Sequence, residues 1–413
     1  MQQQVLIIGT VWVEPNSSAA GSRMLQLIKL FLKQDFKVTF ASSAQKNDKA
    51  IDLSFIGVEE VFIELNSSSF DVFVKKINPT IVVFDRFMME EQYGWRVAEN
   101  CPNALRILDT EDLHFLRKVR HQQLKNEEDF TINALLNSMD AKREIAAILR
   151  CDLSLIISTY EMDLLKSVFK IDEKILYYLP FLLDNIDENQ IQNWKSFEER
   201  EHFVFIGNFF HKPNVDAVLT LKENVWNEIR EYLPKAEIHI YGAYANQQIN
   251  QLHNKNEGFI IKGFAENAQE VVRNARVLLA PLRFGAGIKG KLTEAMICGT
   301  PSVTTSIGAE GMCDRFPWPG FIEDNFSDFA LVSSELYRNK TMWKSSQETG
   351  VDIINYIYDK EKLGVPFVNK IKEIQEKLEE HRTQNFLGNL LQHQTLQATK
   401  YMSKWIESKN ELL

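Results

Sequence analysis

Short runs of apolar residues alternate with segments of helical periodicity along most of the chain. In the first half, apolar runs predict strands at residues 5–8, 38–40, 81–85, 105–109, 153–158 and 175–179. After Gly21, apolar positions at Met24, Ile28 and Phe31 recur at the spacing that places them on one face of a helix. Buried strands separated by helices are typical of a parallel sheet covered on both faces, so the pattern predicts an α/β first half.

A polar, acidic stretch at residues 184–201 interrupts this alternation, which then restarts. We interpret the stretch as a connection between two domains, with a short surface helix as the alternative. Beyond it, apolar runs predict strands at residues 203–206, 237–241, 259–261, 277–280 and 302–305, and residues 215–232 predict a helix. Two doubly wound halves that face each other leave a cleft at the carboxyl ends of both sheets, where open α/β folds bind ligands.

The last part of the chain, from residue 325 onward, has a mostly helical pattern. Near its end, an apolar stripe is formed by Tyr401, Met402, Trp405 and Ile406. We interpret the stripe as packing against the rest of the protein, and the alternative is a surface for a partner or a membrane. The expected domains are 1–184, a linker at 185–201, a second domain at 202–365 and a helical extension at 366–413.

The composition narrows the class of protein. The chain has 413 residues, 45% of them hydrophobic, which is enough for two domains with cores of their own. Its formal net charge of −9 argues against a general nucleic-acid or anionic-membrane binder, although a local basic patch stays open. No apolar stretch approaches the ~20 residues of a membrane span, and the first residues lack the basic start of a signal peptide. The four cysteines form no CxxC pair or zinc spacing, so we expect a reducing cytoplasm.

The most informative stretch is residues 277–312, VLLAPLRFGAGIKGKLTEAMICGTPSVTTSIGAEGM. A strand leads there through a turn into a helix, and the turn holds three glycines and three basic residues, Gly285, Gly287, Gly290, Arg283, Lys289 and Lys291. Glycines let backbone N–H groups approach a ligand, and a helix N-terminus favours anions. These features predict a diphosphate site, with Glu294 one turn further on to bind paired sugar hydroxyls. The alternative is a tight turn with a solvated Lys291–Glu294 pair.

A second strand, loop and helix of this kind stand at the start of the second half. Residues 205–208 end a strand at Gly207, and residues 212–217 begin a helix with Pro213 at a first helical position. Lys212 could reach the same phosphates across the cleft. The alternative for Lys212 is an exposed loop lysine without a ligand.

Four segments together resemble the donor-binding half of glycosyltransferase family 4. They are FIGN…HKPNVDAV from residue 205, IYGAY from 240, PLRFGAGIKGKLTEAMICGTPSVTT from 281 and GAEGM from 308. The resemblance is strong over residues 203–312 and diffuse over the N-terminal half. It implies the GT-B fold, in which two Rossmann-like α/β domains face a cleft. It also implies an enzyme that uses nucleotide-diphosphate sugars, mainly with retention and without metal.

The resemblance further implies roles for individual residues. Glu294 matches the ribose-binding glutamate, and Lys212 and Lys289 match basic positions near the diphosphate. The other residues assigned to the donor site are Gly242 and Phe264 near the nucleobase, Gly21 on the N-terminal side of the phosphates, and Gly207, Asn208, Arg283, Gly285, Gly287 and Ile288. No cofactor and no metal ion are expected besides the donor substrate.

One position departs from the family pattern. Many members carry two glutamates eight positions apart, the first of which touches the donor sugar, and the first position here is Ala286. Backbone N–H groups or another side chain must then hold the sugar. A subset of the family shares this glycine-rich variant, so we do not interpret Ala286 as a loss of activity.

Polar residues follow the strand predicted at residues 105–109. They are Asp109, Glu111, Asp112 and His114, and they are expected to face the cleft because the carboxyl end of a strand meets a helix there. The alternative for Glu111 and Asp112 is a helix start with Thr110 as its cap. His114 is carried over from the resemblance, because family members often place a histidine of the N-terminal domain beside the donor sugar.

A basic helical run comes next and consists of Arg117, Lys118, Arg120, His121 and Lys125. It has two interpretations. The first is a site for an anionic acceptor, such as a lipid-linked diphosphate or a nucleic acid. The second is a solvated face that balances the acidic residues at 127–129.

We therefore expect a glycosyltransferase that moves a sugar from a nucleotide-diphosphate sugar to a glycan, lipid-linked or other hydroxyl acceptor, with retention and without metal. His114, Lys289 and Glu294 are the expected catalytic residues, and Lys289, Lys212 and the loop amides would stabilise the departing diphosphate. Two other functions stay open, a non-catalytic nucleotide-sugar-binding or scaffold protein and a sugar-nucleotide epimerase. Peripheral contact with the inner face of a membrane also stays open.

Overall fold

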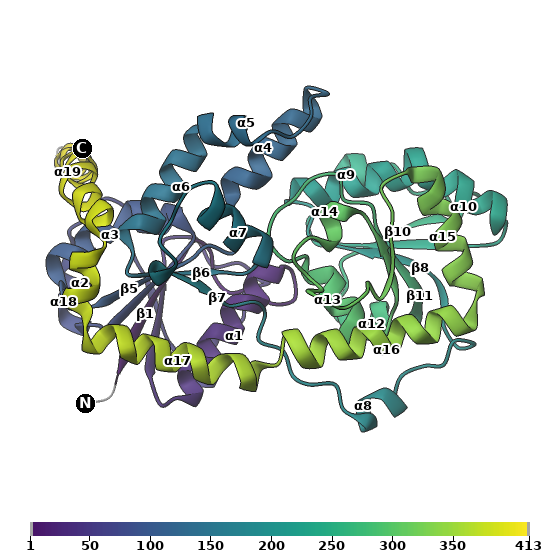
Figure 1. Cartoon of the computed structure of the whole chain (residues 1–413), viewed down its shortest axis with the longest axis horizontal. Coiled ribbons are helices and arrows are strands. Elements are labelled where there is room, and N and C mark those ends of the chain that lie inside the picture. Colours follow the sequence, from purple (N-terminus) through teal and green to yellow (C-terminus); the bar gives the residue numbers. More distant parts are fainter. Residues whose placement is uncertain (1–2, 411–413) are drawn as a thin grey trace.

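The computed structural model describes residues 3–410, apart from the side chains of residues 394–397. Two α/β halves lie side by side, and the chain passes between them near residue 184 and again between helices α16 and α17 (Figure 1). Each half is built on one parallel sheet. The predicted fold class, two doubly wound α/β domains with C-terminal helices, is confirmed.

The first half holds a seven-stranded sheet in the order β3-β2-β1-β4-β5-β6-β7. Its strands are β1 (Gln4–Gly9), β2 (Lys37–Ser42), β3 (Glu59–Phe62), β4 (Ile81–Asp85), β5 (Leu105–Asp109), β6 (Leu153–Ile156) and β7 (Leu176–Tyr178). Both faces of this sheet are buried, because Val5 and Ile7 pack in one core while Leu6 and Ile8 pack in another. The strands therefore consist of continuous apolar runs rather than alternating ones.

The part of the first half that the structure describes also contains α-helices and two short 3-10 turns, and the turns lie before β3 and β7. The helices are α1 (Ala19–Lys33), α2 (Ser69–Ile77), α3 (Phe87–Asn100), α4 (His114–Lys125), α5 (Ile132–Asn137), α6 (Met139–Arg150) and α7 (Thr159–Ser167), and the turns are η1 (Leu53–Ile56) and η2 (Glu173–Ile175). Helix α1 begins at the side chain of Ser18, which accepts a hydrogen bond from the N–H of Gly21. Its predicted apolar face is confirmed, since Met24, Ile28 and Phe31 are buried.

The second half holds a six-stranded sheet in the order β10-β9-β8-β11-β12-β13. Its strands are β8 (Glu201–Ile206), β9 (Ile238–Tyr241), β10 (Phe259–Gly263), β11 (Ala275–Ala280), β12 (Ser302–Thr304) and β13 (Gly320–Ile322). Its helices are α9 (Lys212–Thr220), α10 (Trp226–Tyr232), α11 (Gln247–Asn250), α12 (Ala268–Asn274), α13 (Gly290–Ile297), α14 (Ser306–Ala309), α15 (Phe326–Arg338) and α16 (Lys340–Ile357).

The elements that the sequence pattern missed lie at the edges of the sheets. Strand β3 has two glutamates and is partly exposed, and β13 has three residues, so neither forms a buried apolar run. The helix predicted at 215–232 is divided by a π-helical turn, η3 (Leu221–Val225), between α9 and α10. The acidic stretch at 184–201 contains the short helix α8 (Glu188–Gln192). The domain boundaries at 184, 201 and 365 stay predictions.

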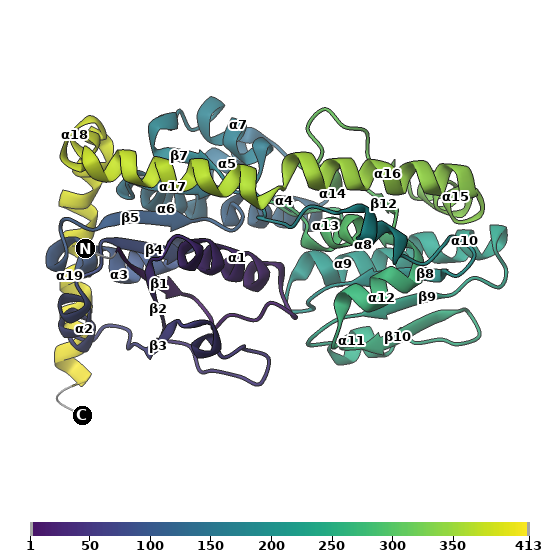
Figure 2. The same cartoon turned by 90° about the horizontal axis from the view of Figure 1, so that it is seen from below.

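The last helices connect the two halves. Helix α16 packs against α13 of the second half, and α17 (Lys360–Glu376) continues along the same side of the molecule onto the first half (Figure 2). Phe367 and Ile371 of α17 belong to the same core as Val5 and Ile7 of β1. Helices α18 (Leu378–Gln384) and α19 (Phe386–Asn410) follow, and α19 packs against α3 and α6.

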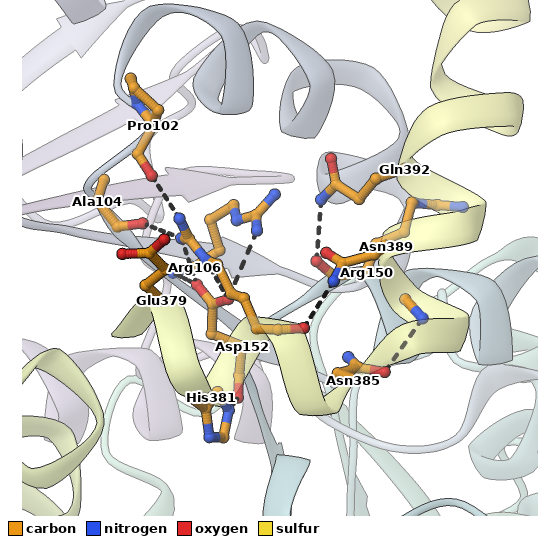
Figure 3. A network of polar contacts seen from close by, with 12 residues as sticks. Pro102, Ala104, Arg106, Arg150, Asp152, Glu379, His381, Asn385, Asn389 and Gln392 are labelled. Atoms are coloured by element: carbon orange, nitrogen blue, oxygen red, sulfur yellow. Dashed lines mark hydrogen bonds and ion pairs between the residues drawn. The ribbon is translucent and has the colours of Figure 1, made fainter. Parts of the chain in front are cut away.

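A buried polar network holds α18 on the first half (Figure 3). The guanidinium of Arg382 donates from Nε and Nη2 to the two carboxylate oxygens of Asp152 at 2.8 Å each, and to the carbonyl of Ala104 at 2.7 Å. The ring of His381 contacts the backbone carbonyl of Asp152 at 2.7 Å. Asp152 also accepts from the N–H of Arg106 at 2.8 Å, so one carboxylate connects α18 to the starts of β5 and β6.

The apolar stripe near the end of α19 does not pack as predicted. Tyr401, Met402 and Trp405 are 65%, 58% and 55% exposed, so the expectation of core packing is wrong for these three residues. The buried position on this part of α19 is Ser403, whose hydroxyl accepts from Nη2 of Arg96 at 3.1 Å. Within residues 3–410, no helix combines the length and the apolar character needed to cross a bilayer.

Candidate functional site

Helices α9 and α13 of the second half begin without a side-chain cap, and their first turns contact each other. The residue before α13 is Lys289 and the residue before α9 is His211, and neither side chain accepts from the first turn of its helix. In the first turn of α13, Lys291 donates from Nζ to Oδ1 of Asn214 in α9 at 2.6 Å. Both helices follow the carboxyl ends of paired strands, β11 and β8. Uncapped N–H groups at the positive end of a helix favour an anion.

Lys289 is buried where the glycine-rich turn meets α13. Its Nζ donates to the carbonyl oxygen of Gly287 at 2.8 Å. Burial lowers the pKa of Lys289 to about 8, and the carboxylates of Glu310 and Glu161 oppose that change. The ammonium is therefore charged at neutral pH and loses its proton above pH 8.

Glu294 lies one turn further along α13. Burial raises the pKa of its carboxyl group to about 7. Among residues 3–410, this carboxyl group has no hydrogen-bond or ion-pair partner. The surface pair with Lys291 is not formed, because Nζ of Lys291 binds Asn214 and lies 4.0 Å above the ring of Phe205. Glu294 thus retains its full capacity to bind a ligand.

Two other basic residues assigned to the donor site lie further out. Arg283 is exposed and donates from Nε to the carboxylate of Asp216 in α9 at 2.9 Å. Its guanidinium is already paired on the outside of the turn. Lys212 is exposed at the first position of α9, beside the uncapped end of that helix. Of the two, Lys212 is the one placed at the uncapped start of a helix.

The glycines at the ends of β8 and β9 allow close packing of the backbone. A Cβ atom added at Gly207 would lie 2.7 Å from Nδ2 of Asn214, and one added at Gly242 would collide with the carbonyl of Gly207. Asn208 spans the two halves, because its Nδ2 donates to the carbonyl of Ser17 at 3.1 Å. These three predicted residues lie together at the carboxyl edge of the sheet.

Phe264 belongs to the second half and Gly21 to the first. Phe264 is 43% exposed, and Nζ of Lys49 from the first half lies 4.9 Å from the centre of its ring. Gly21 is buried in α1, where a Cβ atom would collide with the backbone of Glu14. Ile288 packs its side chain into the core of the second half, so only its backbone can face a ligand.

His114 is the first residue of α4. Its neighbour Asp112 lies next to Gly287 of the second half. Nε2 of His114 lies 3.3 Å from Oδ1 of Asp112, and a Cβ atom added at Gly287 would lie 2.9 Å from Cβ of Asp112. Burial lowers the pKa of His114 to about 4, so its ring is neutral at neutral pH. Although burial acts to raise the pKa of Asp112, Arg117 and His114 hold that pKa well below its ordinary value.

The helix-start interpretation of this segment is wrong for Thr110. Its hydroxyl donates to the carbonyl of Leu155 at 2.9 Å. Helix α4 begins at His114, so the N-cap residue is Leu113 and not Thr110. Glu111 has a positive φ of 62°, and its Oε1 is buried without a hydrogen-bond partner among residues 3–410. Burial, with Asp109 and Asp85 nearby, raises the pKa of Glu111 well above its ordinary value.

The basic run on α4 is largely occupied by acidic partners. Arg117 pairs with Asp112, and Lys118 pairs with Asp140 at 2.7 Å. The ring of His121 stacks on that of Phe284 in the second half, with centroids 4.5 Å apart. The run is therefore neither a uniformly solvated face nor a set of unpaired cations.

Two side chains of the first half contact the glycine-rich turn directly. The sequence did not assign either of them to this turn. Arg120 of α4 donates to the carbonyl of Gly285 at 2.8 Å and pairs with Glu310 at 2.7 Å. Glu161 of α7 accepts from the N–H of Gly287 at 2.8 Å. Glu161 follows the carboxyl end of the strand predicted at 153–158, and that position was the one available signal for it.

Comparison with known proteins finds one matching sequence family and many similar folds. Residues 200–330 match the sequence model of the family described as "Glycosyl transferases group 1". No curated protein sequence matches the chain. Among solved structures, sucrose-phosphate synthase from Thermosynechococcus elongatus is 13% identical with a TM-score of 0.66, over 90% of this chain and 99% of that one.

Two further structures resemble the whole chain. A TarM variant from S. aureus, in complex with fondaparinux, alpha-GlcNAc-glycerol and UDP, is 11% identical with a TM-score of 0.67, over 89% of this chain and 99% of that one. Anabaena HepE in complex with UDP and glucose is 11% identical with a TM-score of 0.64, over 90% of this chain and 100% of that one. The fold is that of GT-B proteins, and the match to glycosyl transferases group 1 is limited to residues 200–330.

Proposed function

We propose that this protein is a glycosyltransferase that moves a sugar from a nucleotide-diphosphate sugar to a hydroxyl acceptor. The observation that carries the proposal is the pair of uncapped helix starts at α9 and α13, with Lys289 and Lys291 beside them. Such a site suits a diphosphate, because the helix N–H groups and the ammonium of Lys289 favour negative charge, although burial lowers the pKa of Lys291 to about 7. The match of residues 200–330 to glycosyl transferases group 1 supports the same conclusion.

In this proposal the residues of α13 divide the work between binding and leaving-group stabilisation. Glu294, which has no partner among residues 3–410, accepts hydrogen bonds from the paired hydroxyls of the ribose. The ammonium of Lys289 stabilises the negative charge that develops on the diphosphate as the bond to the sugar breaks. Lys212, at the start of α9, adds a second cation.

His114 and the glycine-rich turn hold the sugar in this assignment. The neutral ring of His114 offers one donor and one acceptor to sugar hydroxyls. Ala286 brings no carboxylate to the turn, so we infer front-face attack with retention rather than a covalent intermediate, and we propose that the reaction needs no metal ion. TarM and HepE were solved with UDP, which makes a uridine diphosphate sugar the first donor to test.

The acceptor side belongs to the first half. We propose a glycan or lipid-linked hydroxyl acceptor that enters beside Glu111 and His114, at the carboxyl edge of the first sheet. The expected setting is the cytoplasm, with peripheral contact to a membrane where the acceptor is lipid-linked.

The test is a thermal-shift screen of the whole chain with UDP-, GDP-, ADP- and dTDP-sugars, without added metal. A ligand at 100 times its dissociation constant stabilises a protein by about 2.7 kcal/mol, which such a screen detects. We expect one nucleotide class to raise the melting temperature. A response to none of the sugars or mononucleotides would contradict the proposed diphosphate site.

Two other functions are separated by the same reagents. A non-catalytic nucleotide-sugar-binding protein would respond in the screen but release no nucleotide with any acceptor. An epimerase would convert the donor sugar in the absence of an acceptor, and chromatography of a donor-only incubation detects that product.

A further inference from the structure

Three consecutive residues of the glycine-rich turn contact the first half of the protein. The carbonyl of Gly285 accepts from Nη1 of Arg120 at 2.8 Å. Ala286 packs against the core of the first half. The N–H of Gly287 donates to Oε1 of Glu161 at 2.8 Å. The turn belongs to the second half by sequence, but its backbone is held by side chains of α4 and α7.

Each of these two side chains makes a second contact that fixes its own position. Arg120 also donates two hydrogen bonds to the carboxylate of Glu310, at 2.8 and 2.7 Å. Glu161 also accepts at Oε1 from the N–H of Leu113, at the start of α4, at 2.9 Å. Both side chains are buried, Arg120 at 6% exposure and Glu161 at 0%. They therefore act as rigid supports rather than as mobile surface groups.

The shape of the turn determines where the ammonium of Lys289 lies. Its Nζ donates to the carbonyl of Gly287, the residue whose N–H is held by Glu161. Gly287 itself has a positive φ of 63°, which a glycine adopts without strain. A change in the peptide before or after Gly287 would displace the acceptor of the lysine.

We propose that Arg120 and Glu161 are positioning residues of the donor site, which hold the glycine-rich turn in the shape that places Lys289. The proposal rests on the proposed function, because it assigns Lys289 to the departing diphosphate. Since both residues come from the first half, the turn takes this shape only while the two halves are together. The donor site is then complete only when the acceptor-binding half is in place, which protects the donor from water.

The first measurement is hydrogen–deuterium exchange of the whole chain without ligand, followed at peptides that cover residues 283–291. In Arg120→Ala and Glu161→Ala we expect exchange in these peptides to rise at least about tenfold, because a buried backbone partner is lost. Glu161→Gln keeps an oxygen acceptor for both N–H groups, so its peptides should exchange as in the unchanged protein. Peptides from β1 and β11 report whether a variant has unfolded as a whole.

Matched control variants remove similar side chains that do not cross between the halves. Arg143 forms a two-bond pair with Glu91 inside the first half, so Arg143→Ala removes an arginine–glutamate pair of the same kind. Asp163 is exposed on α7, so Asp163→Ala removes a nearby carboxylate from the same helix. Neither control should change exchange at residues 283–291.

The second measurement is steady-state turnover of the nucleotide sugar that the thermal-shift screen identifies. Glu161→Ala should lower kcat at least about tenfold and change KM for the donor less than about threefold, because the turn acts on the departing diphosphate more than on the bound donor. Glu161→Gln should restore most of kcat. A residue with a merely structural role would lower kcat only in proportion to the unfolded fraction.

The outcomes separate the positioning role from the proposed function. Unchanged exchange at residues 283–291 in both alanine variants would overturn the positioning role, even where a nucleotide sugar binds. A silent screen together with raised exchange would leave the supports of the turn in place and overturn the donor-site function that they serve.

Discussion

At the scale of single residues, burial decides the protonation of the candidate site. Burial is the largest influence on Lys289, His114 and Glu294, whose pKa values move to about 8, about 4 and about 7. The sequence pointed to all three residues. Lys289 and Glu294 were found from the glycine-rich turn and the helix after it, and His114 from the family resemblance. Their protonation states were beyond the sequence, because burial depends on the elements that pack around each group.

Lys289→Ala should lower turnover by about 10²–10³-fold, since one group that stabilises developing charge is removed. The free energy of unfolding should fall little, because the lowered pKa of Lys289 means that burial of its ammonium opposes folding at neutral pH. Steady-state kinetics and chemical denaturation measure the two effects. Lys235→Ala, at an exposed position, is the control, and a near-normal rate in Lys289→Ala would remove the lysine from the mechanism.

Glu294→Gln should weaken nucleotide binding about 10- to 100-fold, because hydrogen bonds to an ionised group are the stronger ones. The affinity advantage of the unchanged protein over Glu294→Gln should grow as pH rises through 7, where the carboxylate forms, whereas loss of the proton from Lys291 and Lys289 affects both proteins alike. The contribution of Glu294 to the free energy of unfolding has the opposite trend. Because its carboxyl pKa is raised in the folded state, that contribution falls as pH rises from 4.5 to 7. Calorimetric titration of both proteins at pH 6 and 8 tests this, and an equal ratio of their affinities at the two pH values would contradict it.

At the scale of elements, strands that form apolar runs were predictable, and the two strands without such a run were missed. The runs at 81–85 and 105–109 match β4 and β5, because strands buried on both faces consist of continuous apolar residues. Strands β3 and β13 were missed because β3 is partly exposed and has two glutamates, and β13 has only three residues, none of them buried. The glycine-rich turn was predicted from its composition, whereas its contacts with α4 and α7 were not.

Gly287→Ala should destabilise the protein by about 1–2 kcal/mol, because an L-residue is strained at a φ of 63°. The added Cβ would also lie 2.9 Å from Cβ of Asp112 in the first half. Gly285→Ala is a matched change in the same turn, where the nearest atom would be 3.6 Å away. Chemical denaturation should show a loss in the first variant and little change in the second, and equal losses would argue against the strain.

At the scale of the whole molecule, the chain returns to its first half after completing the second. Helix α17 packs Phe367 and Ile371 into a core of the first half. Arg382 of α18 binds Asp152 of the same half. Any relative movement of the two halves must therefore be accommodated between α16 and α17 and near residue 184. Three apolar residues near the end of α19 were expected to be buried but are exposed. Helix α19 packs against α3 and α6, and the buried residue on this part of it is Ser403.

Arg382→Ala should cost about 3 kcal/mol of stability, because the buried carboxylate of Asp152 loses its two-bond partner. Hydrogen–deuterium exchange in α18 and α19 should rise more than exchange in the second half. Lys372→Ala, at an exposed position of α17, is the control. Unchanged exchange in α18 would mean that apolar packing alone holds these helices.

The sequence by itself determined the two α/β halves, the glycine-rich turn before α13, and the candidate residues Lys289 and Glu294. These follow from local patterns, since apolar runs, glycines and helix starts act over a few neighbouring residues. Only the tertiary structure decided that Arg120 and Glu161 of one half support the turn of the other, and that Lys291 faces Asn214 rather than Glu294. Such contacts join residues more than 70 positions apart, and they form because burial leaves each polar group no partner except one supplied by a distant segment.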